Sequence, residues 1–206
     1  MEQDEFLTIN KAGEGLYKEK GSKFIGYAEP VEKEEDIKTI LDNIKAEHHN
    51  ARHHCYAYRL GIDKEIFRMN DDGEPSSTAG KPIYGQILAN NLTNIIIIVV
   101  RYFGGTKLGT SGLIRAYKTA AEEAIKKTTI IKRTVGEIFI IEFDYDRMNE
   151  VMKIIHDESL KILDKDFQSY CTFTLGIRKK NQENLINRIK QSKGIKITKA
   201  NKTVCM

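Results

Sequence analysis

The residues best suited to chemistry in this chain lie in a glycine-rich stretch that runs from Arg101 to Arg115. Glycines let the backbone turn freely and leave its amide groups uncovered. Uncovered amides at the start of a helix attract anions, and basic side chains nearby strengthen the attraction. We therefore expect a site for a phosphate or another acidic group, built from Arg101, Gly104, Gly105, Thr106, Lys107, Gly109, Thr110 and Arg115.

The glycine pattern matches neither common nucleotide-binding motif. Gly104 and Gly109 have the spacing of a phosphate loop, but Thr110 stands where the Walker lysine should be. The Gly-x-Gly-x-x-Gly of dinucleotide folds is also missing. A tight strand-to-helix turn, with glycines that serve packing alone and with Thr110 or Ser111 capping the helix, explains the stretch equally well.

A second polar stretch, residues 47–55, holds four histidines and a cysteine. It lacks the His-Glu-x-x-His of a helical zinc site, and adjacent residues on a strand point to opposite faces. We expect His53 to share a strand face with Cys55, and His54 with Tyr56. We predict no bound zinc and no cofactor. A hydrogen-bonded histidine pair lining a groove and a plain polar connection between helix and strand both fit.

A third polar stretch, residues 70–82, has loop chemistry at nearly every position. Its acids lack the Asp-x-Asp-x-Asp-Gly order of a calcium loop. Loops of this length in compact domains are usually functional or disordered, and the specific composition favours a functional one. Together with the histidine stretch it supplies the candidates for one groove, which are Arg52, His53, His54, Asp71, Asp72, Glu74, Ser76 and Thr78.

Apolar elements adjoin all three stretches, so we expect the stretches to converge in space. Residues 94–100 form an unbroken β-branched run, typical of a strand buried on both faces. Gly13 and Gly15 indicate a turn. We expect further strands at 6–9, 24–28, 53–60 and 65–70, and helices at 32–47, 83–92 and 113–127.

Residues 128–134 mark an expected domain boundary, because the order of elements changes character there. The later residues indicate β-α-β-β-α-β, the ferredoxin-like order. We predict an α+β protein whose residues 1–130 and 131–206 form separate hydrophobic cores. The expected C-terminal strands are 135–143, 160–167, 169–178 and 194–203, and the helices are 146–158 and 182–191.

Charge is distributed unevenly along the 206 residues, whose formal net charge is +4. Residues 178–202 carry nine basic side chains against one acid, Glu183. Such a surface suits RNA, although a solvated lysine-rich face gives the same composition. The candidates for nucleic-acid contact are Arg178, Lys179, Lys180, Lys196, Lys199 and Lys202.

No apolar run approaches the roughly 18 residues that a membrane span needs. The acidic N-terminus does not resemble a signal peptide. The three cysteines form no disulfide or zinc pattern. We therefore expect a cytoplasmic protein with no membrane partner.

Four motifs, at residues 20–26, 47–58, 71–82 and 100–109, together resemble the IMPACT family in its bacterial, YigZ-like form. The resemblance implies an N-terminal domain folded like the second domain of ribosomal protein S5, followed by a ferredoxin-like domain. The pair resembles domains IV and V of elongation factor G. In eukaryotic relatives the resemblance implies a link to translational control.

We expect a non-enzymatic binding protein connected with translation, contacting RNA or a ribosome-associated partner. Aromatic residues are sparse in the basic stretch, which disfavours base stacking there. The alternative is an enzyme acting on a phosphorylated or nucleotide substrate, with His53 or His54 as the general base and the loop acids as metal ligands or acid. A pure protein-interaction module is the third possibility.

Overall fold

The computed structural model describes residues 4–205, without the side chains of residues 179, 180, 201–203 and 205. The chain divides into two compact units. The N-terminal unit comprises residues 6–132, and the C-terminal unit comprises residues 4–5 and 133–205. Each contains an antiparallel sheet with helices packed on it, so the predicted α+β class is confirmed. No helix among the described residues has the length and apolar character to span a membrane.

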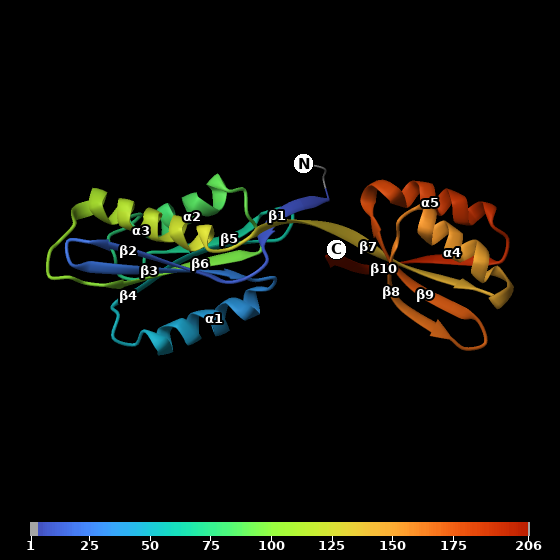
Figure 1. The fold of residues 1–206 in the computed structure, drawn as a ribbon, viewed down its shortest axis with the longest axis horizontal. Helices are drawn as coiled ribbons and strands as arrows, with labels where there is room; N and C mark the ends of the chain where they lie inside the picture. The colour runs from blue at the N-terminus through green and yellow to red at the C-terminus, as the bar shows by residue number, and fades with distance from the viewer. Residues whose placement is uncertain (1–3, 206) are drawn as a thin grey trace. The chain divides into compact units, whose positions relative to one another are not determined.

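The N-terminal unit is a three-layer structure around a sheet of order β2-β3-β6-β4-β5. Helices α2 and α3 cover one face of the sheet, and α1 covers the other (Figure 1). Its elements are β2 (Gly13–Glu19), β3 (Ser22–Pro30), α1 (Glu34–Glu47), β4 (His53–Leu60), β5 (Ile66–Asn70), α2 (Gly80–Ala89), β6 (Ile95–Tyr102) and α3 (Gly109–Lys126).

Strand β6 is the centre of this unit. Every side chain from Ile95 to Val100 is fully buried. Ile95, Ile97 and Val99 pack beneath α2 and α3, whereas the alternate residues pack against α1. The absence of polar alternation therefore reflects burial on both faces, as the sequence predicted.

Strand β2 replaces the turn that the sequence indicated at Gly13 and Gly15, so that prediction is wrong. Both glycines are buried and alternate with exposed residues, which is the period of a strand. A Cβ atom on Gly15, or on Gly26 of the neighbouring strand, would fall on the backbone of α3. These glycines therefore allow the helix to lie directly on the sheet.

Both helices on that face begin earlier than the sequence indicated. Helix α3 starts at Gly109 instead of residue 113, because the last glycines of the loop form its first turn. Its N-cap is Leu108, so neither Thr110 nor Ser111 is the cap. Helix α2 starts at Gly80, which places Pro82 inside its first turn.

The C-terminal unit has the predicted β-α-β-β-α-β order. In its five-stranded sheet β8 pairs with β9, β9 pairs with β7, and β7 also pairs with β10 and β1. The pairs β10–β7, β7–β9 and β8–β9 are antiparallel. Its apolar cluster joins α4 and α5 to β7 and β9 and draws only on residues of this unit. The elements are β1 (Glu5–Ile9) and β7 (Ile130–Phe143), which both cross the unit boundary, then η1 (Tyr145–Arg147), α4 (Met148–Asp157), β8 (Lys161–Phe167), β9 (Cys171–Arg178), α5 (Lys179–Gln191) and β10 (Ile195–Cys205).

Candidate functional site

A cavity of about 470 Å³ in the N-terminal unit gathers residues from all three polar stretches. It lies where β4 begins, β6 ends and α3 begins. Strands β4 and β6 are antiparallel neighbours, and His53 lies opposite Arg101 across the ladder. We call it the Arg101 cavity; it is lined by Arg52, His53, Glu74, Pro75, Arg101, Phe103, Lys107, Leu108, Gly109, Thr110 and Leu113.

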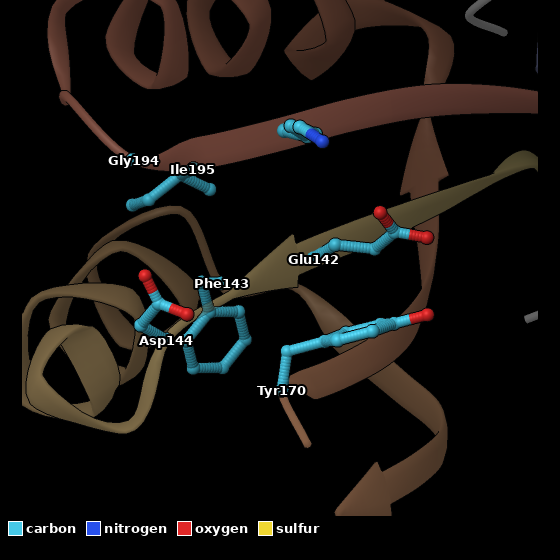
Figure 2. A pocket seen from close by; sticks show the side chains of 7 residues that line it. Glu142, Phe143, Asp144, Tyr170, Gly194 and Ile195 are labelled. Carbon is cyan, nitrogen blue, oxygen red and sulfur yellow. The ribbon is translucent and has the colours of Figure 1, made fainter. Parts of the chain in front are cut away.

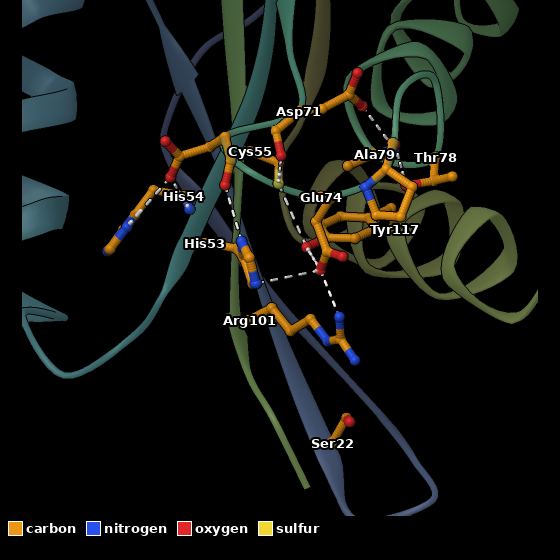
Figure 3. Close-up of polar contacts among 12 residues, drawn as sticks. Ser22, His53, His54, Cys55, Asp71, Glu74, Thr78, Ala79, Arg101 and Tyr117 are labelled. Atoms are coloured by element: carbon orange, nitrogen blue, oxygen red, sulfur yellow. Dashed lines mark hydrogen bonds and ion pairs between the residues drawn. The ribbon is translucent and has the colours of Figure 1, made fainter. Parts of the chain in front are cut away.

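A buried ion pair forms the floor of the site. The Arg101 guanidinium donates to Glu74 Oε1 at 2.5 Å, and the Tyr117 hydroxyl donates to the same oxygen at 2.8 Å (Figure 3). The side chains of Arg101 and Glu74 are only 7% and 4% exposed. Two aromatic rings, those of Phe24 and Phe103, lie 5.4 and 5.6 Å from the guanidinium carbon. The orientation of Arg101 is therefore fixed by several contacts.

His53 presents its second ring nitrogen toward this ion pair. Its Nδ1 lies 2.8 Å from the carbonyl oxygen of Asp72. A carbonyl only accepts, so Nδ1 carries a proton and donates. Nε2 then holds the lone pair in the neutral ring and lies 4.0 Å from Glu74 Oε1. The imidazole can therefore accept a proton at the cavity.

His54 and Cys55 are held away from the cavity opening. The ring of His54 is buried, and this burial lowers its pKa, which disfavours the protonated ring. Cys55 lies in the core beneath α2 and α3, on the face that His53 shares, as predicted. Its thiol donates to the Asp71 carbonyl at 3.0 Å or to the Tyr117 hydroxyl at 3.3 Å. Burial raises the pKa of the Cys55 thiol, which makes it a poor nucleophile.

The acidic loop is organised around Asp71, whose carboxylate accepts hydrogen bonds from backbone amides. It accepts the amide hydrogens of Ser77, Ala79 and Gly80 at 2.8–2.9 Å and so joins the loop to the start of α2. Asp72 accepts the amide hydrogen of His54 at 2.6 Å. Only Glu74 among the three acids lines the cavity.

The two hydroxyl candidates of that loop also lie outside the cavity lining. Thr78 is buried and donates to the carbonyl of Pro75 at 2.6 Å. Ser76 is exposed. The structure thus brings together Arg52, His53 and Glu74 from the predicted groove. It leaves out His54, Asp71, Asp72, Ser76 and Thr78, none of which contributes to the lining.

One glycine of the glycine loop is packed against a neighbouring turn, whereas two others face open space. Gly104 packs on the backbone of Gly21, and its amide donates to Ser22 Oγ at 3.2 Å, so this amide already has an acceptor. Gly105 and Gly109 have positive φ angles of 87° and 70° and face open space. The later part of the loop supplies Lys107, Gly109 and Thr110 to the cavity. Outside the lining, Gly105 and Thr106 are exposed, and Arg115 pairs with Glu19.

Two buried hydrogen-bonded groups, those of Tyr117 and His48, have only weak signals in the sequence. Tyr117 lies among alanines on the buried face of α3, and a buried tyrosine usually needs a partner for its hydroxyl. His48 is hydrogen-bonded to the hydroxyls of Tyr27 and Tyr102, at 2.7 and 2.8 Å. Burial and nearby acids raise the pKa of Tyr27 to about 12, so this hydroxyl keeps its proton.

Two of the basic candidates of the C-terminal unit form ion pairs with local acids. Arg178 pairs with Glu5 at 2.7 Å, and Lys199 pairs with Glu137 at 2.6 Å. Lys196, like Glu142 and Asp144, lines a second cavity of about 530 Å³. Figure 2 shows the Glu142 and Asp144 side chains at this cavity. The side chains of Lys179, Lys180 and Lys202 lie outside the described residues. Nucleic-acid contact by this unit stays a prediction.

Metal binding has little support in the geometry. Within the part of the chain that the structure describes, no three His, Cys, Asp or Glu side chains are placed to hold a metal ion together. The carboxylates of Asp71 and Asp72 are already engaged with backbone amides.

Comparisons with known proteins give the class of this chain. The family model described as the Impact N-terminal domain matches residues 20–125. An IMPACT family member from Haemophilus influenzae is 37% identical over 166 residues, covering 80% of this chain and 81% of the relative. A solved structure described as a hypothetical protein is 26% identical with a TM-score of 0.70, covering 97% of this chain and 98% of the other. The chain belongs to the IMPACT family.

Its form within that family is the bacterial, YigZ-like one. The IMPACT family member YigZ of Escherichia coli is 33% identical over 153 residues, which cover 73% of this chain and 75% of the relative.

Proposed function

We propose that this protein is a cytoplasmic, non-enzymatic binding protein connected with translation or its regulation. It contacts RNA or a ribosome-associated partner through an anionic group held in the Arg101 cavity. Family membership supports the link, because the IMPACT resemblance implies translational control in eukaryotic relatives. We further propose that the N-terminal unit has the fold of the second domain of ribosomal protein S5. The strand order of the C-terminal unit suits the ferredoxin-like type.

The observation that carries the proposal is the charge of the cavity. Three cationic side chains, Arg52, Arg101 and Lys107, face one carboxylate, that of Glu74. Arg52 and Lys107 are exposed, and neither forms an ion pair within the described residues. The start of α3 adds its partial positive charge on the same side. An anion is therefore attracted to Arg52 and Lys107 without having to displace an acidic side chain from either of them.

The C-terminal unit is proposed to add salt-dependent affinity through Arg178, Lys179, Lys180, Lys196, Lys199 and Lys202. The pairing of Arg178 and Lys199 with acids reduces the charge that these two offer to a polyanion. We therefore assign the selective contact to the cavity and a general electrostatic contribution to this unit.

The test measures binding of the full chain to ribosomes and to a short single-stranded RNA across salt concentrations. The variant Arg52→Ala/Lys107→Ala removes two cavity charges, and Lys11→Ala/Lys118→Ala removes two exposed charges outside the cavity. For single-stranded RNA, each lost phosphate contact reduces the magnitude of the slope of log affinity against log salt concentration by about 0.7. The cavity variant, which loses two contacts, should therefore have a slope smaller in magnitude by about 1.4. A third variant, Lys196→Ala/Lys199→Ala, measures the C-terminal contribution. Equal binding by the cavity and control variants would refute the proposal.

A second candidate function is catalysis on a phosphorylated or nucleotide substrate. One observation favours it: His53 is held in the tautomer that leaves Nε2 free to accept a proton at the cavity. Asp71 and Asp72 are engaged with backbone amides, and Glu74 is engaged with Arg101 and Tyr117, which leaves His53 as the candidate general base. Turnover of nucleoside phosphates that disappears in His53→Asn, while binding persists, would establish this function in place of simple binding.

A further inference from the structure

We infer that the Arg101 cavity accepts one unpaired nucleotide unit, a base with its sugar and phosphate. This inference rests on the proposed function, because it names the chemical class that the anion site recognises. The cavity has two kinds of wall. Beside the cationic residues stand four apolar side chains, those of Pro75, Phe103, Leu108 and Leu113.

The phosphate end lies between the start of α3 and Arg101. The first turn of α3, residues 109–112, contains no acidic residue, and no described side chain caps it. Arg101 provides an independent indication. Its Nε is buried and has no hydrogen-bond partner among the described residues, while its terminal nitrogen is held by Glu74. A buried donor without an acceptor is costly, and a phosphate oxygen is a suitable acceptor for it.

The base end lies on Phe103. This ring is 55% exposed, and the Arg101 guanidinium carbon lies 5.6 Å from its centroid. An exposed aromatic ring beside a phosphate-binding group is the arrangement on which single-stranded bases stack. Inorganic phosphate or a carboxylate would leave this ring and Pro75 in water, whereas a nucleotide would cover them.

The cavity size favours a single nucleotide over a duplex. A volume of about 470 Å³ falls in the range of small-ligand pockets. In a duplex the bases are paired and stacked, so no base face would be available to Phe103. The same chemistry is offered by a free nucleoside monophosphate and by the phosphorylated end of a single-stranded RNA.

The experiment is isothermal titration calorimetry of the full chain with adenosine 5′-monophosphate, adenosine and inorganic phosphate. The nucleotide should bind more tightly than either part. Phe103→Leu should weaken nucleotide binding about 5- to 150-fold, the value of one stacked base, and leave phosphate binding unchanged. Lys107→Ala should weaken both, and Lys118→Ala, on the exposed side of α3, should change neither.

Single-stranded RNAs with a 5′-phosphate or a 5′-hydroxyl separate the two sources. A preference for the 5′-phosphate assigns the site to RNA ends, and its absence alongside tight nucleotide binding assigns it to free nucleotides. Equal affinity for phosphate and nucleotide, with no effect of Phe103→Leu on nucleotide binding, would overturn the inference. The cavity would then still bind an anion, as the proposed function requires. A different result would refute the proposed function: RNA and ribosome binding that is unchanged in the variant Arg52→Ala/Lys107→Ala.

Discussion

Removing the Glu74 carboxylate should destabilise the N-terminal unit more than any surface change. Glu74→Met leaves the Arg101 guanidinium buried without its partner and deprives the Tyr117 hydroxyl of its acceptor. Breaking a buried ion pair from one side costs about 3–5 kcal/mol. The double variant Glu74→Met/Arg101→Met removes both charges and should lose less than the single variant. Apolar replacement of a whole buried pair is often close to neutral.

Urea unfolding measures these differences, with hydrogen exchange of the β6 amides reporting the N-terminal unit separately from the other. Glu123→Gln is the matched control, since the side chains of Glu123 and its partner Lys126 are both exposed and such pairs contribute little. The double-mutant cycle should give a coupling energy of about 2 kcal/mol or more between the two positions. Equal losses in the single and double variants would show that Glu74 and Arg101 do not act as one buried unit.

Three further predictions concern packing and titration. Gly15→Ala should destabilise the fold by about 1–3 kcal/mol, since its Cβ would meet the α3 backbone, whereas Gly85→Ala, with open space inside α2, should stabilise it by about 0.5–1 kcal/mol. The lowered pKa of His54 means that the unfolded chain binds the proton more readily; the urea midpoint should therefore fall as pH drops below 6.5, and His54→Asn should flatten that fall. The raised pKa of the buried Cys55 thiol predicts that mass spectrometry finds it unalkylated in the native protein and alkylated after unfolding; rapid native alkylation would contradict its burial.

Hydrophobic periodicity predicted most of the elements because burial fixes it directly. The unbroken run in β6 and the apolar stripe of α1 are examples. The turn predicted at Gly13 and Gly15 is wrong because glycine is equally suited to a turn and to a strand position in close contact with a helix. Which role applies depends on α3, more than a hundred residues later in the chain, and no local pattern shows it.

The candidate site was predictable by residue type but not by orientation. Arg101, His53, Glu74 and Lys107 were all among the expected residues, because charged and histidine side chains next to buried strands usually have a specific purpose. The carboxylate of Asp71 looked equally available, yet it organises the loop before α2. Its role depends on backbone amides whose direction only the folded loop determines.

The most direct test of the account follows the Arg101 Nε–H resonance by NMR while a 5′-phosphorylated single-stranded RNA is added to the full chain. The account predicts a saturable shift of this resonance and of the Gly109 and Thr110 amides, strongly reduced in Lys107→Ala and unchanged in Lys118→Ala. RNA binding that leaves the Arg101 resonance in place and shifts only residues of the C-terminal unit would contradict it.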